Sequence, residues 1–364
     1  MSVSEAALTA ALATVIDPHT EQPYTAGRQL KNLRVGAGGA VAFDIELAYP
    51  ARSQFGAVRD ALAAAARSVE GVASVAVEVS SKVIAHQVQR GVALLPGVAN
   101  VIAVSSGKGG VGKSTTAVNL ALALAAEGAR VGLLDADIYG PSLPLMMGIE
   151  GRPESEDGKT MKPLENHGVK VMSIGFLVDA EQAVVWRGPM ATQALDQLLR
   201  QTTWGELDYL VIDMPPGTGD IQLTLSQRVP LTGAVIVTTP QDIALLDAKK
   251  GLNMFEKVGV PILGIVENMA VHVCTNCGHV EHIFGADGGK RMSAQYGVHY
   301  LGALPLTMRI REQTDSGTPT VAAEPDGEIA ALYKAVARQV AVVVAGKAKD
   351  FSAKFPTISI SKTT

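Results

Sequence analysis

The chain has 364 residues, of which 47% are hydrophobic and 18% are charged, and its formal net charge is -4. This length exceeds one average domain and indicates about two. The charge balance offers no basic excess for counterion-driven binding, so we expect no nucleic-acid partner. The N-terminus lacks the basic start and apolar core of a secretion signal, and no apolar stretch approaches the ~20 residues that span a bilayer. We therefore expect a cytoplasmic protein with no membrane partner.

The first 81 residues predict a small α-β-β-α-β domain. Helical spacing of apolar side chains and an alanine-rich run each indicate a helix, while apolar runs and alternation indicate strands. A glycine-rich turn at residues 36–39 predicts that the first two strands form a hairpin. The expected elements are a helix over 4–16, strands over 30–35 and 41–47, a helix over 54–68 and a strand over 72–79.

Beyond residue 98, seven short apolar runs alternate with segments of helix length. This alternation predicts the α/β fold class, with a doubly wound and mostly parallel sheet, in which ligands collect at the carboxyl ends of the strands. We place this domain at 98–345, after a linker over 82–97 and before a polar tail over 346–364. The apolar runs are 101–104, 131–134, 169–174, 209–212, 234–237, 262–266 and 300–303.

A glycine-rich loop follows the first of these strands and precedes an alanine- and leucine-rich helix. Its spacing is that of a Walker A motif in the strand-loop-helix context that the motif requires. Glycines let backbone N–H groups close around phosphates, Lys113 neutralises their charge, and the Ser114 hydroxyl can ligate magnesium. We therefore expect an ATP and Mg²⁺ site that includes Gly107, Lys108, Gly109, Gly110, Val111, Gly112, Lys113, Ser114 and Thr115.

Carboxylates follow two other strands of the predicted sheet. Asp135 and Asp137 come after the second strand, and Asp213 ends the apolar run Leu210-Val211-Ile212, as in a Walker B element. Carboxylate oxygens at a strand end can hold magnesium and orient water. The sequence predicts Asp135 and Asp213 as magnesium ligands beside Ser114.

Lys108 is a second lysine within the glycine-rich loop, and with it the chain resembles the deviant Walker A family that includes MinD, ParA and the nitrogenase iron protein. The resemblance implies that two protomers sandwich two nucleotides and that Lys108 reaches the partner's phosphates during catalysis; the alternative is a solvated loop lysine. It also implies that Asp137 positions the attacking water. The Pro-Pro-Gly-Thr-Gly run after Met214 resembles a switch loop, and Asn268 and Pro305 match the family's adenine contacts.

Cys274 and Cys277 form the one cysteine pair of the chain, in a polar insertion with His272, His279 and His282. A CxxC pair supplies half of a four-thiolate site. Either the neighbouring histidines complete a zinc centre, or a second chain contributes two further thiolates, or the pair is a redox dithiol.

Several motifs together resemble the Mrp/ApbC iron-sulfur carriers, over residues 95–345. They are the phosphate loop, Asp-Ala-Asp-Ile-Tyr-Gly-Pro-Ser from 135, Trp-Arg-Gly-Pro-Met at 186–190, the switch run and the CxxC loop. The resemblance implies a homodimeric ATP hydrolase whose Cys274 and Cys277 bridge a labile [4Fe-4S] cluster between protomers. It also implies partners among cluster-assembly scaffolds and apo iron-sulfur proteins, to which the cluster is transferred.

The first domain resembles the small domain that accompanies cluster-assembly factors, through Val15-Ile16-Asp17-Pro18. It departs from that pattern at His19, where an acid is frequent, and it contains no cysteine. We therefore expect this domain to act in recognition or structure. Two alternatives remain for the whole chain: a positioning ATPase of the MinD/ParA kind, and a zinc-stabilised scaffold that binds ATP without using its hydrolysis.

Overall fold

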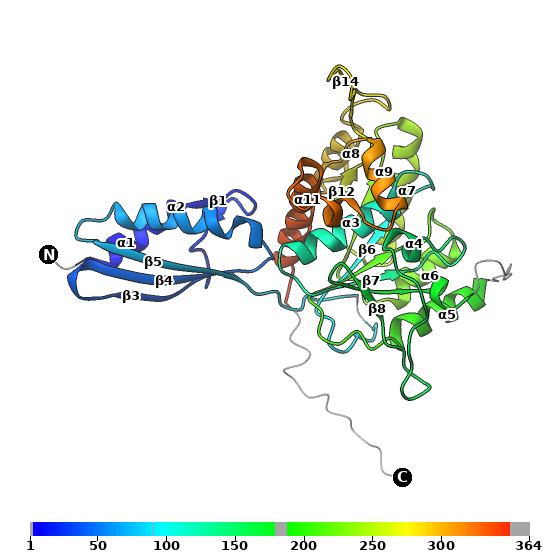
Figure 1. Cartoon of the computed structure of the whole chain (residues 1–364), viewed down its shortest axis with the longest axis horizontal. Coiled ribbons are helices and arrows are strands. Elements are labelled where there is room, and N and C mark those ends of the chain that lie inside the picture. The colour runs from blue at the N-terminus through cyan, green and yellow to red at the C-terminus, as the bar shows by residue number, and fades with distance from the viewer. Residues whose placement is uncertain (1–2, 90, 179–187, 350–364) are drawn as a thin grey trace, which may run out of the picture.

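The computed structural model describes residues 3–89, 91–178 and 188–349. Figure 1 shows a small N-terminal domain beside a larger domain built around a central sheet. Between β5, which ends at Ser81, and β6, which begins at Val101, the described chain forms only isolated bridges, including one from His86 to Lys349. Among the described residues, none of the helices is both long and apolar enough to cross a membrane.

The small domain has the predicted order of helices and strands. β4 pairs with β3 in the antiparallel sense and with β5 in the parallel sense, and alternate residues of β4 are buried against α1 and α2. The sequence missed one short hairpin, β1 with β2, which is too short to show a period. The elements are α1 (Glu5–Leu12), β1 (Ile16–Asp17), β2 (Gln22–Pro23), β3 (Leu30–Val35), β4 (Ala40–Leu47), α2 (Phe55–Arg67) and β5 (Ser74–Ser81).

The larger domain contains the predicted doubly wound sheet, in the order β15-β12-β11-β6-β10-β7-β9-β8. All seven predicted strands are present and parallel, which confirms the fold class. Their apolar runs are continuous because both faces of the sheet are covered. The strands are β6 (Val101–Ser105), β7 (Val131–Asp135), β8 (Leu164–Asn166), β9 (Val169–Ser173), β10 (Tyr209–Asp213), β11 (Gly233–Thr238), β12 (Ile262–Glu267) and β15 (Tyr300–Ala303).

Helices cover the two faces of this sheet in separate layers. α3 and α11 pack on one face, whereas α5, α7 and α8 bury apolar side chains against the other. β8 is an antiparallel edge strand that the sequence did not predict, because only three residues form it. The helices are α3 (Lys113–Ala126), α4 (Leu143–Met146), α5 (Gly188–Arg200), α6 (Asp220–Arg228), α7 (Asp242–Lys257), α8 (Gly288–Tyr296), α9 (Met308–Asp315), α10 (Thr320–Ala323) and α11 (Glu328–Ala345).

A buried ion pair of the larger domain, Glu127 with Arg338, anchors Ser53 of the small domain at the domain junction. Glu127, the residue that follows α3, is fully buried and accepts hydrogen bonds from the backbone N–H (2.9 Å) and hydroxyl (2.7 Å) of Ser53. Arg338 of α11 donates to the same carboxylate. A negative charge at the carboxyl end of a helix opposes the helix dipole, so Glu127 depends on these partners. The N-terminal domain is thereby fastened to the end of α3 that lies opposite the glycine-rich loop.

We predict that Arg338→Met lowers the free energy of unfolding by about 3–5 kcal/mol, because it leaves Glu127 buried without its cation. Arg311→Met is the matched control: Arg311 is 61% exposed in its pairs with Glu312 and Asp315, and such pairs contribute less than about 1 kcal/mol. Urea denaturation of both variants, followed by circular dichroism, measures the difference. Equal midpoints would show that the buried pair does not stabilise the domain junction.

Candidate functional site

The glycine-rich loop leads from the central strand β6 into the buried helix α3. Gly112, with φ of 78°, occupies the left-handed position just before Lys113 opens the helix, and Gly110 has φ of 80°. The first N–H groups of a helix have no partners within it, and the helix dipole favours negative charge at that end. The loop and the helix start therefore form an anion site at the carboxyl edge of the sheet.

Two glycines of this loop are required by close packing. A Cβ on Gly107 would overlap the backbone of Asp247 in α7, and one on Gly112 would overlap the amide of Asn268. The Asn268 side chain donates a hydrogen bond to the carbonyl of Val111 at 2.9 Å. The structure thus places Asn268 directly against the loop, while its contact with adenine stays a prediction.

Lys113 and Asp213 form a buried ion pair at the end of β10. The lysine ammonium donates to Oδ1 of Asp213 and lies 3.2 Å from the Ser114 hydroxyl. Oδ2 of Asp213 is buried and has no hydrogen-bond partner among the described residues. The structure therefore brings the predicted lysine, hydroxyl and Walker B carboxylate together and leaves one carboxylate oxygen available.

Asp135 is fully buried and accepts four hydrogen bonds. Its donors are the backbone N–H groups of Asp137 (3.1 Å), Ser142 (3.1 Å) and Leu143 (3.2 Å) and the hydroxyl of Ser173 (3.0 Å). Burial, and then the neighbouring Asp213, raise the pKa of Asp135 to about 7. Both oxygens already hold the loop after β7, so this geometry favours an orienting role over direct magnesium coordination.

Asp137 lies in the loop after β7 and is partly buried. Burial raises the pKa of its carboxyl group, while Lys113 opposes that shift. Lys113 pairs with Asp213 and acts on Asp137, and Asp213 in turn acts on Asp135, so three carboxylates share one buried lysine and the site has an excess of negative charge. A divalent cation would correct this excess, so the residues fit magnesium, with Ser114 and the free oxygen of Asp213 as the available ligands.

The predicted switch run contacts the glycine-rich loop directly. The N–H of Gly217 donates to the carbonyl of Ser106 at 3.0 Å, and the N–H of Met214 donates to Val104 at 3.0 Å. The φ of Gly217 is 90°, a conformation that favours glycine. A change in the position of the loop would therefore be transmitted to the switch segment.

The remaining predicted nucleotide contacts lie near the same loop. Lys108 is partly exposed at its outer turn, and its carbonyl accepts a hydrogen bond from the Ser106 hydroxyl at 2.8 Å. The segment that contains Pro305 runs beside the residues after β12. The backbone N–H of Leu304 donates to the carbonyl of Glu267, and the N–H of Ala270 donates to the carbonyl of Leu304. This pairing brings Pro305 close to the segment that carries Asn268. Trp186 and Arg187 of the Trp-Arg-Gly-Pro-Met run lie outside the described residues.

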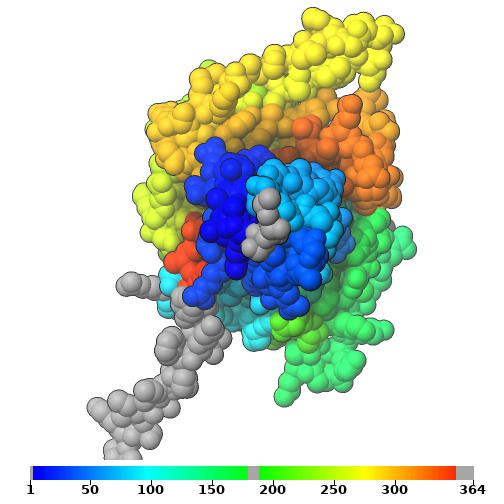
Figure 2. Space-filling view, turned by 90° about the vertical axis from the view of Figure 1, so that its left-hand side faces the viewer, coloured from blue at the N-terminus to red at the C-terminus, as the bar shows by residue number. Residues whose placement is uncertain are grey.

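The two cysteines lie on a projecting hairpin of β13 (His272–Val273) and β14 (Val280–Glu281). Cys274 donates its N–H to His279 at 2.9 Å and accepts from Gly278 at 2.8 Å, which closes a tight turn with Cys277 exposed at its tip. The backbone N–H groups of Cys277 and Asn276 lower the pKa of the Cys274 thiol. Figure 2 shows this segment, in yellow, extending beyond the body of the molecule.

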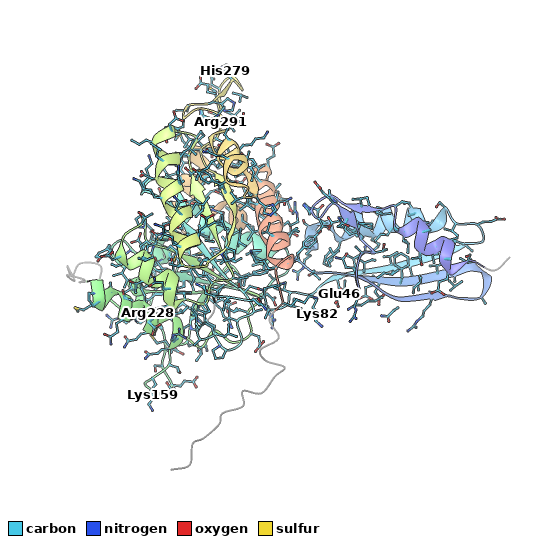
Figure 3. All side chains as sticks on the ribbon, turned by 180° about the vertical axis from the view of Figure 1, so that it is seen from behind. Glu46, Lys82, Lys159, Arg228, His279 and Arg291 are labelled. Carbon is cyan, nitrogen blue, oxygen red and sulfur yellow. The ribbon has the colours of Figure 1, made fainter. Side chains whose placement is uncertain are left out.

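The three histidines of the insertion do not gather around the cysteines. His272 and His282 each pair a ring nitrogen with a backbone carbonyl, of Leu306 (3.0 Å) and Ala270 (2.9 Å) respectively. His279 lies at the outer end of the hairpin in Figure 3, 3.9 Å from Glu281. Within the described ranges, no group of three or more His, Cys, Asp or Glu residues could hold a metal ion.

Sequence reasoning missed three supporting residues of the nucleotide site: Ser173, Ser106 and Gln222. Ser173 ends β9 beside Asp135, and its position at a strand end was the one available signal. Gln222 donates to Ser105 from α6, a contact between residues far apart in the chain. Only tertiary packing brings such a pair together.

Two protein families match this chain. The NUBPL iron-transfer P-loop NTPase family matches residues 97–341, and an iron-sulfur cluster assembly protein family matches residues 5–79. An iron-sulfur cluster carrier protein of Pseudomonas fragi is 61% identical over 272 residues, which cover 74% of this chain and 95% of that protein. An iron-sulfur cluster carrier protein of Synechocystis is 44% identical over 346 residues, which cover 94% of this chain and 98% of that protein.

Solved structures agree with the architecture of the larger domain. A nucleotide-binding protein from Archaeoglobus fulgidus in complex with ADP is 38% identical, with a TM-score of 0.56, and covers 64% of this chain and 90% of that chain. The cell division ATPase MinD of Pyrococcus furiosus is 24% identical, with a TM-score of 0.52, and the match covers 66% of this chain and 98% of that chain. The second similarity supports the fold alone.

We predict that Gly107→Ala destabilises the protein by about 1–3 kcal/mol and weakens ATP binding, because its Cβ displaces the loop from α7. Gly109→Ala is the matched control, since no atom lies within 4 Å of a Cβ built there, and its stability should stay within about 0.5 kcal/mol of wild type. Thermal unfolding without nucleotide separates the two. Equal losses would contradict the packing requirement at Gly107.

We predict that the pH dependence of stability reports the buried Asp135. Its pKa of about 7 in the folded protein lies above the unfolded value, so the folded state retains a proton that the unfolded chain loses. Stability therefore falls as the pH rises from about 4 to about 7, by at most about 4 kcal/mol. Asp135→Asn should flatten this slope in urea titrations, and added magnesium should reduce it in the wild type. Parallel curves for both proteins would refute the assignment.

Proposed function

This chain belongs to the NUBPL iron-transfer P-loop NTPase family, and we propose that it is an ATP-dependent carrier of a [4Fe-4S] cluster that acts as a homodimer. The observation that supports this proposal is the combination, in one chain, of a phosphate site and a projecting hairpin that carries two free thiols, one partly buried and one exposed. The iron-sulfur cluster carrier protein of Synechocystis aligns with 94% of this chain, and so with both of its parts. We extend the proposal to a cytoplasmic location and to apo iron-sulfur proteins and cluster-assembly scaffolds as partners.

The charges of the site support ATP hydrolysis as its reaction. The N–H groups at the start of α3 hold the phosphates, and Lys113 leaves Asp213 to neutralise them. The freed carboxylate of Asp213 and the hydroxyl of Ser114 would hold magnesium, which would neutralise phosphate charge. Asp137 orients the attacking water, while Asp135 keeps the loop after β7 in position through its four hydrogen bonds. Lys108 adds positive charge at the phosphates of a partner subunit.

The number and position of the thiols support cluster binding. One hairpin offers two sulfur ligands, two of its three histidines (His272 and His282) are engaged with backbone carbonyls, and a [4Fe-4S] cluster takes four thiolates. Two hairpins brought together by a dimer would complete the set. The backbone N–H groups that lower the pKa of the Cys274 thiol also favour the thiolate form that ligates iron.

Anaerobic reconstitution tests the cluster assignment. We expect about four irons per dimer and a visible absorption band in wild type, and loss of both in Cys274→Ala and Cys277→Ala. Iron, zinc and oligomeric mass are measured on the same samples. Stoichiometric zinc in each monomer would refute the cluster and leave the ATPase assignment standing.

Steady-state ATP hydrolysis tests the catalytic assignment. We expect Asp137→Ala to lower kcat by at least about 100-fold with little change in nucleotide affinity, and Lys113→Ala to lose ATP binding. Lys108→Ala should bind ATP but lose both nucleotide-dependent dimerisation and turnover. Lys159→Ala is the matched lysine control, on the side of the domain opposite His279 in Figure 3. Normal turnover in Lys108→Ala would refute the role across the dimer.

A further inference from the structure

A buried glutamine, Gln222, connects the switch segment to the glycine-rich loop. Gln222 lies in the first turn of α6, three residues after Gly219, and is 1% exposed. Its amide nitrogen donates to the hydroxyl of Ser105, the last residue of β6, which is fully buried. A second connection runs parallel to it, from the N–H of Gly217 to the carbonyl of Ser106. The start of α6 and the start of the loop are therefore held together at two adjacent residues.

The other end of the Gln222 amide is unpaired. Its Oε1 is buried and has no hydrogen-bond partner among the residues that the structure describes. With the amide rotated by half a turn, Ser105 would donate to the oxygen and the nitrogen would be the unpaired atom, so one polar end lacks a partner in either orientation. A buried polar group without a partner lowers the stability of the folded state. A methionine of similar shape would avoid this cost.

An unpaired buried amide next to a switch segment indicates that the amide gains a hydrogen-bond partner in another state of the site. The segment 214–219 contains two glycines and leads directly into Gln222. If phosphate and magnesium draw this segment toward the loop, the first turn of α6 carries the Gln222 amide with it and changes the groups that face its unpaired end. The bond to Ser105 would keep the carboxyl end of β6 aligned during that movement.

We propose that Gln222 is a positioning residue that couples the nucleotide-induced movement of the switch segment to the glycine-rich loop. The end of its amide that is unpaired in the nucleotide-free protein gains a hydrogen-bond partner when nucleotide binds. This inference rests on the proposed ATPase function. It predicts that the Gln222 amide raises kcat and lowers the unfolding temperature of the nucleotide-free protein. A residue with a purely structural role would contribute to stability and leave turnover per folded molecule unchanged.

The test compares Gln222→Met with wild type in nucleotide-free thermal unfolding and in steady-state ATP hydrolysis. We expect an unfolding temperature equal to or above that of wild type, a kcat about 10-fold lower and a KM for ATP within about twofold. Ser105→Ala should lower kcat similarly, and the double variant should be no slower than either single one, because both remove the same hydrogen bond.

Gln89→Leu is the matched control at the opposite end of α6. Its amide donates to the carbonyls of Ser226 (2.8 Å) and Val229 (3.1 Å), so the variant should unfold at a lower temperature and keep the wild-type kcat. A kcat for Gln222→Met within twofold of wild type would overturn the inference, as would a loss of stability equal to that of Gln89→Leu. Absence of hydrolysis in wild type would instead refute the proposed function itself.

Discussion

The balance of charge at the carboxyl edge of the sheet is the constraint on which the site depends. Three carboxylates, Asp135, Asp137 and Asp213, share this edge with one buried lysine. A buried charge is tolerated only when it is paired, and here the pairing is incomplete until phosphate and a divalent cation enter together. The nucleotide-free protein therefore holds Lys113 and Asp213 against each other. The ammonium of this pair is complementary to a phosphate, and the free oxygen of its carboxylate is complementary to a divalent cation.

Helix α3 transmits this constraint beyond the site. Its first residue is Lys113, its middle is buried between the sheet and α11, and the residue after its end is Glu127. The interdomain carboxylate and the phosphate site thus lie at opposite ends of one rigid element. The helix dipole acts on the charges at both ends of α3. It favours a phosphate at the amino end and disfavours the Glu127 carboxylate at the carboxyl end, so Glu127 requires Arg338. The position of the N-terminal domain therefore depends on the same helix that binds the nucleotide.

The sequence predicted the sheet and the phosphate loop because both are encoded locally. Continuous apolar runs identify strands buried on two faces, and the glycine spacing identifies the loop without knowledge of its neighbours. It did not predict the pairing of Glu127 with Ser53 and Arg338, since these residues are distant in the chain and meet only through domain packing. Nor could it show that the oxygens of Asp135 are already occupied. A residue type predicts what a side chain can bind, whereas only the fold determines which of its atoms remain free.

The cysteine hairpin is connected to the phosphate loop by a short series of contacts. The side-chain amide of Asn268 donates a hydrogen bond to the carbonyl of Val111. Two residues later, the carbonyl of Ala270 forms a hydrogen bond with a ring nitrogen of His282 at the base of the hairpin. The same stretch pairs with Leu304, so it cannot shift as a free loop. Proximity alone does not establish coupling, which requires an element with two arrangements that both ligands bias. Asn268 supplies the physical connection, because its amide contacts the glycine-rich loop and its backbone leads into the cysteine hairpin. A movement of the loop large enough to break the bond to Val111 would therefore reach the base of the hairpin first, at Ala270 and His282, and the cysteines only through that base.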